Sequence, residues 1–220
     1  MTEGQPFFQL DWVLEHLDTL ARRIGEHLLV TVIAVVAGFA ISFALALVVR
    51  RHPRLYPPIL AVSGVLYAIP SIALFVLFIP ITGLSLLTAE IALVSYTLVI
   101  LVRNIVTGLR GVPAEVIEAA RGMGYTDRQR LWRVELPIAL PIIVAGVRIA
   151  TVTTIGLVTI ATLIGMGGLG YLIVNIGVRQ RFPTATLTGI AIVVILSTIV
   201  DVGLQALERR LTPWSKAREA

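Results

Sequence analysis

The chain has 220 residues, of which 57% are hydrophobic and 14% are charged, and its mean hydropathy is +0.92. Soluble domains carry about 25% charged residues, so this composition excludes an ordinary soluble domain, a disordered chain and a nucleic-acid-binding module, and it predicts an all-α membrane protein. The net charge of +5 is spread along the chain rather than gathered in one patch, and the absence of cysteine excludes disulfides, zinc–thiolate sites and iron–sulfur clusters.

The amino-terminal segment, residues 1–27, is expected to lie on the outer surface of the bilayer. It carries five acidic residues and only two arginines, which is not the composition of a cleavable signal sequence. Its apolar side chains are spaced as one face of an amphipathic helix. These side chains are Phe8, Trp12, Leu17, Leu20 and Ile24.

Five apolar stretches are long enough to cross a hydrocarbon core of about 30 Å, which requires roughly 20 helical residues. The uncharged run that follows Leu55 is too long for one helix, and turn-forming residues around Gly83 divide it. The expected spans are 28–49, 56–79, 86–106, 137–161 and 184–206, the fourth opening at Pro137. They form one transmembrane domain, 28–206, followed by a short basic tail, 207–220.

The distribution of basic residues predicts the orientation. If the loop after the third span is cytoplasmic, 13 of the 18 lysines and arginines lie on the inner side and four on the outer side. With five spans, the N-terminus is then outside and the C-terminus inside.

The polar interval 107–136, between the third and fourth spans, is predicted to hold two short helices. Gly122 and Gly124 end the first helix. Thr126, followed three residues later by Gln129, is a capping-box pattern that begins the second. On periodicity alone, this loop is either a docking element for another protein or a solvated connector.

Seven positions of this loop form a specific pattern. They are Glu118-Ala119-Ala120, Gly124, Val134 and Leu136-Pro137. The pattern resembles the EAA loop of ABC-importer permeases, with Val134 in place of the usual isoleucine. Further motifs, among them Arg103-Asn104 and Gly165-Met166-Gly167-Gly168-Leu169-Gly170, extend the resemblance over roughly residues 55–210 to the permeases of glycine betaine/choline/carnitine osmoprotectant importers.

The resemblance implies a binding-protein-dependent ABC-importer permease fold in the cytoplasmic membrane of a bacterium or archaeon. It implies a cytoplasmic ABC ATPase dimer, a second permease subunit (identical or related) and an extracytoplasmic substrate-binding protein as partners, with no cofactor and no nucleic acid. The loop would be a coupling helix in a groove of the ATPase. The implied coupling residues are Glu118, Ala119, Ala120, Gly122, Gly124, Leu136 and Pro137.

The chain itself lacks the residues for ATP hydrolysis. A phosphate-binding P-loop places a lysine after glycines, whereas the one lysine here, Lys216, follows Trp214 and Ser215. The glycines of 165–170 satisfy the spacing of a dinucleotide-binding loop, but they follow an apolar span rather than a strand. We therefore expect a non-enzymatic subunit whose ATPase is a separate protein.

Candidate residues of the transport path are fewer and less specific. Glycines at the outer end of the fourth span form either a gate or a close helix contact. Arg148 lies within the fourth span and is either functional or bonded to backbone carbonyls. Aromatic faces attract quaternary ammonium groups, although tyrosines at span ends more often lie at the bilayer interface. The candidates are Pro70, Tyr67, Arg148, Gly165, Gly167, Gly168 and Gly170, with Tyr96 and Tyr171 as further aromatic residues.

The leading functional hypothesis is an ATP-driven importer of compatible solutes such as glycine betaine, choline or carnitine. An ion-gradient-driven secondary carrier of small amines or amino acids is the alternative. A membrane scaffold that only recruits a partner through the loop is a third.

Overall fold

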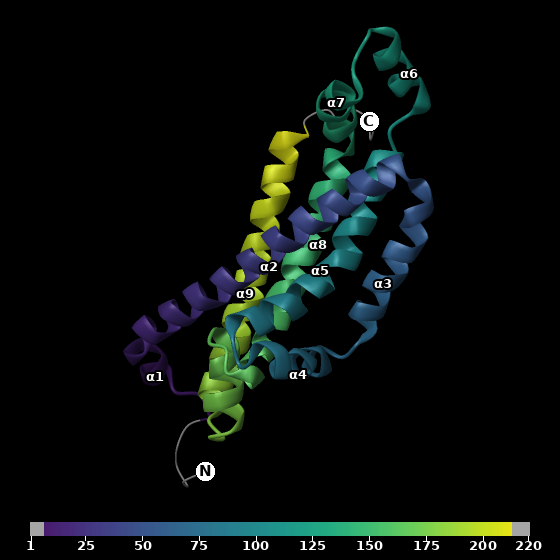
Figure 1. Cartoon of the computed structure of the whole chain (residues 1–220). Coiled ribbons are helices and arrows are strands. Elements are labelled where there is room, and N and C mark those ends of the chain that lie inside the picture. The colour runs from purple at the N-terminus through teal and green to yellow at the C-terminus, as the bar shows by residue number, and fades with distance from the viewer. Residues whose placement is uncertain (1–6, 213–220) are drawn as a thin grey trace.

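The computed structural model describes residues 7–212, and within that range every regular element is helical (Figure 1). The all-α prediction is therefore confirmed. The elements are α1 (Leu10–Glu15), α2 (Leu17–Arg51), η1 (Pro53–Leu55), α3 (Tyr56–Ala68), α4 (Ser71–Thr82), α5 (Leu86–Arg110), α6 (Ala114–Gly122), α7 (Asp127–Arg130), η2 (Leu131–Glu135), α8 (Leu136–Ala161), η3 (Thr162–Ile164), η4 (Tyr171–Val178) and α9 (Pro183–Leu211).

The core lies where α2 crosses α5 and α8 (Figure 1). Small residues allow these helices to approach closely. Such residues are common at helix contacts in membranes, because apolar helices in lipid are not driven together by the hydrophobic effect and depend on close packing. A Cβ added to Gly38 of α2 would lie 1.9 Å from the Thr97 Oγ1 of α5. A Cβ added to Gly146 of α8 would lie 2.4 Å from the Asn104 Cβ of α5.

Helix α2 begins earlier than the sequence indicated. It is one unbroken helix of 35 residues from Leu17 to Arg51, rather than a surface segment followed by a span from Leu28. Some of the apolar side chains that we expected to rest on the bilayer pack instead against the protein, since Leu20, Trp12 and Ile24 cluster with Leu169 and Leu172. Phe8 and Leu17 remain exposed. The amino-terminal segment is therefore joined to the body of the fold.

The expected second span, 56–79, is not one helix. It consists of α3 and α4, which meet at an angle of 97°. Pro70 is the cause, because proline has no N–H to continue the helix and forces the preceding residue away from helical angles. Ile69 accordingly has an extended backbone, with φ of −66° and ψ of 130°. The candidate path residue Pro70 therefore lies at a complete break between two helices.

The fourth span, expected at 137–161, agrees with α8, Leu136–Ala161, which has Pro137 in its first turn, but helical structure begins before it. A single helical run of 38 residues extends from Asp127 to Ile164, through α7, the π-helical turn η2 and α8. A proline inside an α-helix lacks one hydrogen bond and clashes with the carbonyl four residues before it. The wide π turn η2 directly precedes Leu136 and Pro137, so the α-helical hydrogen-bonding pattern is already interrupted where the proline follows.

Four of the described helices are long and apolar enough to cross a membrane, or five if the bent pair α3–α4 counts as one span. The last helix, α9, runs from Pro183 to Leu211, so it includes the start of the expected basic tail; residues 213–220 of that tail lie outside the described range. Helices α6 and α7 lie at one end of the bundle, and α1 and the segment after α8 lie at the other (Figure 1). We call these the loop end and the glycine end.

Candidate functional site

The loop end presents α6, which carries the Glu-Ala-Ala sequence. Glu118 and Ala119 are exposed, whereas Ala120 is buried, so only part of this sequence is free to contact another molecule. Gly122 is also exposed, and a Cβ added there would have no neighbour within 4 Å. The exposed face of α6 therefore combines one carboxylate with small residues that would allow a close approach of another backbone.

Gly124 has a structural role at the end of α6. Its φ is +81°, a left-handed conformation that glycine adopts without strain. The N–H of Tyr125 bonds to the carbonyl of Ala120 at 3.1 Å, and the N–H of Gly124 bonds to that of Arg121 at 2.9 Å. These two bonds form a Schellman cap, which fixes the direction in which the chain leaves α6.

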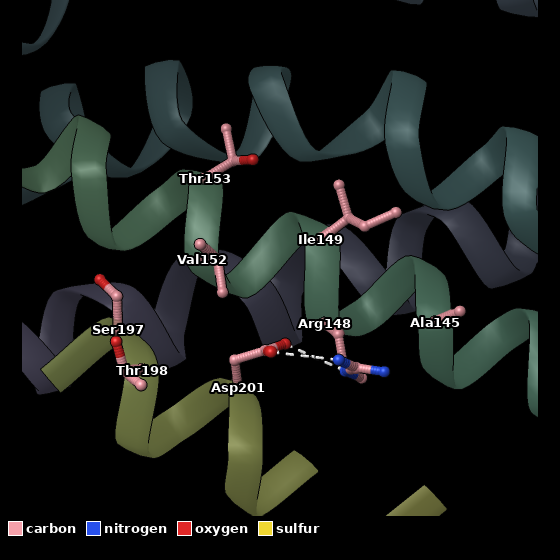
Figure 2. Close-up of a pocket in the computed structure, with 8 residues that line it drawn as sticks. All are labelled: Ala145, Arg148, Ile149, Val152, Thr153, Ser197, Thr198 and Asp201. Atoms are coloured by element: carbon pink, nitrogen blue, oxygen red, sulfur yellow. Dashed lines mark hydrogen bonds and ion pairs between the residues drawn. The ribbon is translucent and has the colours of Figure 1, made fainter. Parts of the chain in front are cut away.

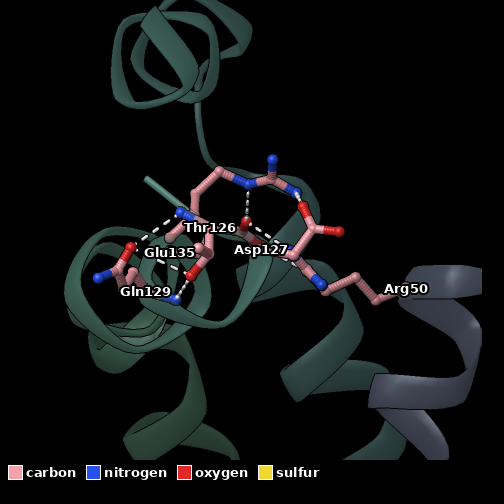
Figure 3. Close-up of polar contacts among 6 residues, drawn as sticks. Arg50, Thr126, Asp127, Gln129 and Glu135 are labelled. Atoms are coloured by element: carbon pink, nitrogen blue, oxygen red, sulfur yellow. Dashed lines mark hydrogen bonds and ion pairs between the residues drawn. The ribbon is translucent and has the colours of Figure 1, made fainter. Parts of the chain in front are cut away.

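The capping box predicted at the next helix is present (Figure 3). The Thr126 Oγ1 accepts a hydrogen bond from the Gln129 N–H at 3.3 Å, and the Gln129 Oε1 accepts one from the Thr126 N–H at 2.9 Å. The start of α7 is thus fixed by the sequence pattern that predicted it.

A buried ionic network ties this end of α8 to α2 (Figure 3). Arg50 of α2 donates two hydrogen bonds to the Glu135 carboxylate, at 2.7 and 2.8 Å, and Arg130 donates another at 2.7 Å. Arg130 also lies 2.9 Å from Asp127. The Glu135 side chain is only 5% exposed, and the network lines a cavity of about 470 Å³ between α2, α5 and α6. It makes Glu135 a rigid link between the loop and the end of α2.

A second cavity, of about 540 Å³, opens between α8 and α9 (Figure 2). Arg148 of α8 forms a bidentate pair with Asp201 of α9, at 3.0 and 3.1 Å, and its third contact is Glu208 at 3.1 Å. Ser197, Thr198 and Thr153 add hydroxyl groups to the wall. Arg148 therefore bonds to carboxylates, not to the backbone carbonyls that we gave as its structural alternative.

The glycines of 165–170 form a turn at the glycine end. Gly165 and Gly168 have φ of +86° and +79°. A Cβ added to Gly170 would lie 2.1 Å from the Thr159 carbonyl oxygen, and one added to Gly167 would lie 2.2 Å from the Glu26 Oε2. Gly167 and Gly170 thus allow a close approach of neighbouring atoms, and Gly165 and Gly168 allow the turn its left-handed backbone.

The break between α3 and α4 brings two of the tyrosines together. The rings of Tyr67 and Tyr96 pack edge to face with centroids 5.5 Å apart. The Tyr96 hydroxyl donates a hydrogen bond to the carbonyl of Ile69, next to Pro70, and so caps the broken helix. Tyr171 lies elsewhere, and the Arg23 guanidinium is stacked over its ring at 4.0 Å.

Comparison with known proteins identifies the family. The family model described as the binding-protein-dependent transport system inner membrane component matches residues 31–213. The chain belongs to this family of transport permeases.

Curated relatives match this permease over nearly its whole length. It is 38% identical to the carnitine transport permease protein of Listeria monocytogenes, with 97% of this chain and 96% of that protein covered. It is 35% identical to the choline transport system permease protein of Bacillus subtilis, covering 90% and 91%, and 37% identical to the osmoprotectant import permease protein of Salmonella typhimurium, covering 93% and 97%.

Among solved structures, an inward-facing conformation of the MetNI methionine ABC transporter matches with a TM-score of 0.81 and 26% identity. The match covers 90% of this permease and 98% of that chain. It confirms the ABC-permease fold that the sequence predicted.

Sequence reasoning missed the partners of this permease's polar groups. Arg50 pairs with Glu135 from 85 residues away, and no local pattern in the sequence indicates this partner. Asp201 of α9 likewise pairs with Arg148 of the neighbouring α8, 53 residues away. The position of Arg148 within an apolar span was the available signal. Such a position indicates that the residue is important, but it does not indicate which residue it pairs with.

Proposed function

We propose that this permease is the transmembrane subunit of an ATP-driven importer of compatible solutes such as glycine betaine, choline or carnitine. The solute class is supported by relatives whose names specify choline, carnitine or osmoprotectant transport, at 35–38% identity over at least 90% of this chain.

The proposed orientation has the N-terminus outside and the C-terminus inside a bacterial or archaeal cytoplasmic membrane. The excess of lysine and arginine at the loop end supports it, because basic residues favour the inner side. The loop end then faces the cytoplasm, and the glycine end faces the extracytoplasmic binding protein.

The proposed energy source is ATP hydrolysis by a separate ABC ATPase dimer, because the sequence has no P-loop lysine. A second permease subunit, identical or related, completes the path. The permease itself is not an enzyme.

The observation that carries this proposal is the exposed face of α6. Glu118, Ala119 and Gly122 are accessible at the loop end. The Schellman cap fixes how the chain leaves α6 towards α7, and the Glu135 network ties α7 and η2 to α2. A rigid segment transmits a push from a docked ATPase, whereas a solvated connector would absorb it. Ala120, Gly124, Leu136 and Pro137 support the docking face rather than forming it.

The path is proposed to include Arg148, the break at Tyr67 and Pro70, and the glycine turn. The side chains of Arg148 and Asp201 are 21% and 39% exposed. Charges exposed at this depth avoid lipid and face a bundle interior or water. The cavity between α8 and α9 therefore faces the path or the second permease subunit.

The test is uptake of radiolabelled glycine betaine into proteoliposomes holding the permease with its co-purified ATPase and binding protein. Glu118→Lys is expected to abolish most ATP-dependent uptake without removing the protein from the membrane. Asp18→Lys, the same change on an exposed carboxylate at the start of α2, away from the loop end, is the control and is expected to keep most of it.

Three outcomes would count against the proposal. Wild-type uptake by Glu118→Lys would remove the docking role of α6. Uptake driven by an ion gradient without ATPase would support the secondary carrier. An ATPase that binds while no solute moves would support the scaffold.

A further inference from the structure

Two successive side chains of α2 hold the glycine turn. The Glu26 Oε2 accepts a hydrogen bond from the Gly168 N–H at 2.9 Å, and the His27 Nδ1 accepts one from the Leu169 N–H at 3.3 Å. The turn and these side chains are 142 residues apart in the sequence. Two neighbouring backbone amides that a turn leaves free are therefore satisfied by one short piece of another helix.

The two contacts differ in their surroundings. His27 is fully buried, and its Nε2 donates to the carbonyl of Ile155 in α8 at 2.9 Å, so both ring nitrogens are engaged. The Glu26 side chain is 38% exposed and is held by Arg23 at 2.8 Å. Water can therefore compete with the hydrogen bond between Gly168 and Glu26, but not with the one between Leu169 and His27.

The glycines allow this contact to form. A Cβ at Gly168 would come within 3.2 Å of the His27 Nδ1, so a side chain there would press on the ring. Arg23 adds a second attachment through the ring of Tyr171, which follows the turn directly. The turn is thus attached to α2 on both sides of Leu169.

This attachment lies at the end of the bundle opposite the coupling loop (Figure 1). If α6 meets the ATPase, the glycine turn lies at the mouth that receives solute from the binding protein. Any opening of that mouth that moves the turn away from α2 must break the Gly168–Glu26 hydrogen bond.

We propose that Glu26 and His27 are positioning residues of the outer gate. Glu26 is a latch: its hydrogen bond to Gly168 holds the glycine turn closed and breaks when the turn opens. His27 is the fixed pivot, whose contact with Leu169 stays in place. The proposal rests on the proposed function, because it assigns the turn to the outer mouth of the path. It assigns to the amino-terminal part of α2 a role in transport itself.

The first test uses the absence of cysteine from the chain, which makes introduced thiols unambiguous. Met166→Cys places a thiol in the turn, and its rate of modification by an impermeant maleimide measures how often the turn opens. Adding Glu26→Ala is expected to raise that rate about tenfold, the change in population that corresponds to loss of one charge-assisted hydrogen bond. Asp18→Ala, which removes an exposed carboxylate of the same helix, is the control and is expected to leave the rate unchanged.

The second test separates a latch from a purely structural contact. In proteoliposomes, Glu26→Ala is expected to lower glycine betaine uptake per ATP hydrolysed severalfold while ATP hydrolysis continues. A Glu26→Cys/Gly167→Cys pair is expected to block uptake when oxidised and to recover it on reduction.

An unchanged labelling rate in Glu26→Ala, an unchanged ratio of uptake to hydrolysis, or full uptake by the oxidised cysteine pair would overturn the latch. These results are distinct from failure of the proposed function, which would show as absent ATP-dependent uptake in the wild-type protein. His27→Ala is expected to lower thermal stability as well as uptake, whereas Glu26→Ala is expected to retain wild-type stability within a few degrees.

Discussion

Replacing Glu135 with alanine removes the carboxylate that Arg50 and Arg130 share. The side chains of Glu135, Arg50 and Arg130 are 5%, 18% and 9% exposed. Without Glu135, Arg50 would remain largely out of water with no carboxylate partner, and Arg130 would keep only the exposed Asp127. Breaking a buried ion pair by removing one partner costs roughly 3–5 kcal/mol. For a chain of this length, each kcal/mol lowers the melting temperature by about 2–4 °C, so the expected loss is about 6–20 °C.

The assay is thermal unfolding of the purified permease in mild detergent, followed by size-exclusion chromatography of the protein that survives heating. Asp127→Ala is the control, because Asp127 also contacts Arg130 but its side chain is 82% exposed. An exposed pair contributes about 0–1 kcal/mol, so this variant is expected to melt within a few degrees of the wild type. Equal melting temperatures for Glu135→Ala and Asp127→Ala would refute the argument that burial makes Glu135 the anchor of the loop.

Three further changes test other parts of the fold. Gly124→Ala, at a φ of +81°, is expected to destabilise the end of α6 by about 1–2 kcal/mol. Gly122→Ala, with open space around it, is the control and is expected to leave α6 intact. Amide hydrogen exchange of α6 measures the difference, and equal exchange in the two variants would contradict the prediction. Glu90→Gln is expected to raise the melting temperature, because neither oxygen of this buried carboxylate has a hydrogen-bond partner among residues 7–212. A lower melting temperature would contradict this, by showing that the native protein stabilises the Glu90 charge. Tyr96→Phe is expected to lower the free energy of unfolding by about 1–3 kcal/mol, because it removes the hydrogen bond to the Ile69 carbonyl at the α3–α4 break. Tyr67→Phe, at an exposed ring, is the control in the same melting assay.

Local chemistry could be predicted from the sequence. The capping box depends on Thr126 and Gln129, three residues apart, and the glycine break at Gly124 depends on one backbone conformation. Both signals lie within a few residues of the structure they determine. The apolar spans were predictable for the same reason, because their length and composition are local properties.

Long-range geometry could not be predicted. The run 56–79 was expected to be one span, but it is broken at Pro70, and the 97° angle depends on how α3 and α4 each pack on α5. Nothing near Glu26 in the sequence indicates that its partner is Gly168. The start of α2 was missed because the acidic and basic residues before Leu28 indicated a surface segment, whereas the neighbouring apolar side chains pack on Leu169 and Leu172.

The uninterrupted helical run from Asp127 to Ile164 has a mechanical consequence. Its 38 residues, at 1.5 Å each, make a rod of about 57 Å, nearly twice the thickness of the hydrocarbon core. A rod that pivots at its middle by about 5° displaces each tip by about 2.5 Å in opposite directions. The rod begins just after α6 and ends at the glycine turn. If α6 receives the push that we propose, a rigid rod would deliver it to the glycine end by leverage, without a chain of rearranged side chains between the two ends.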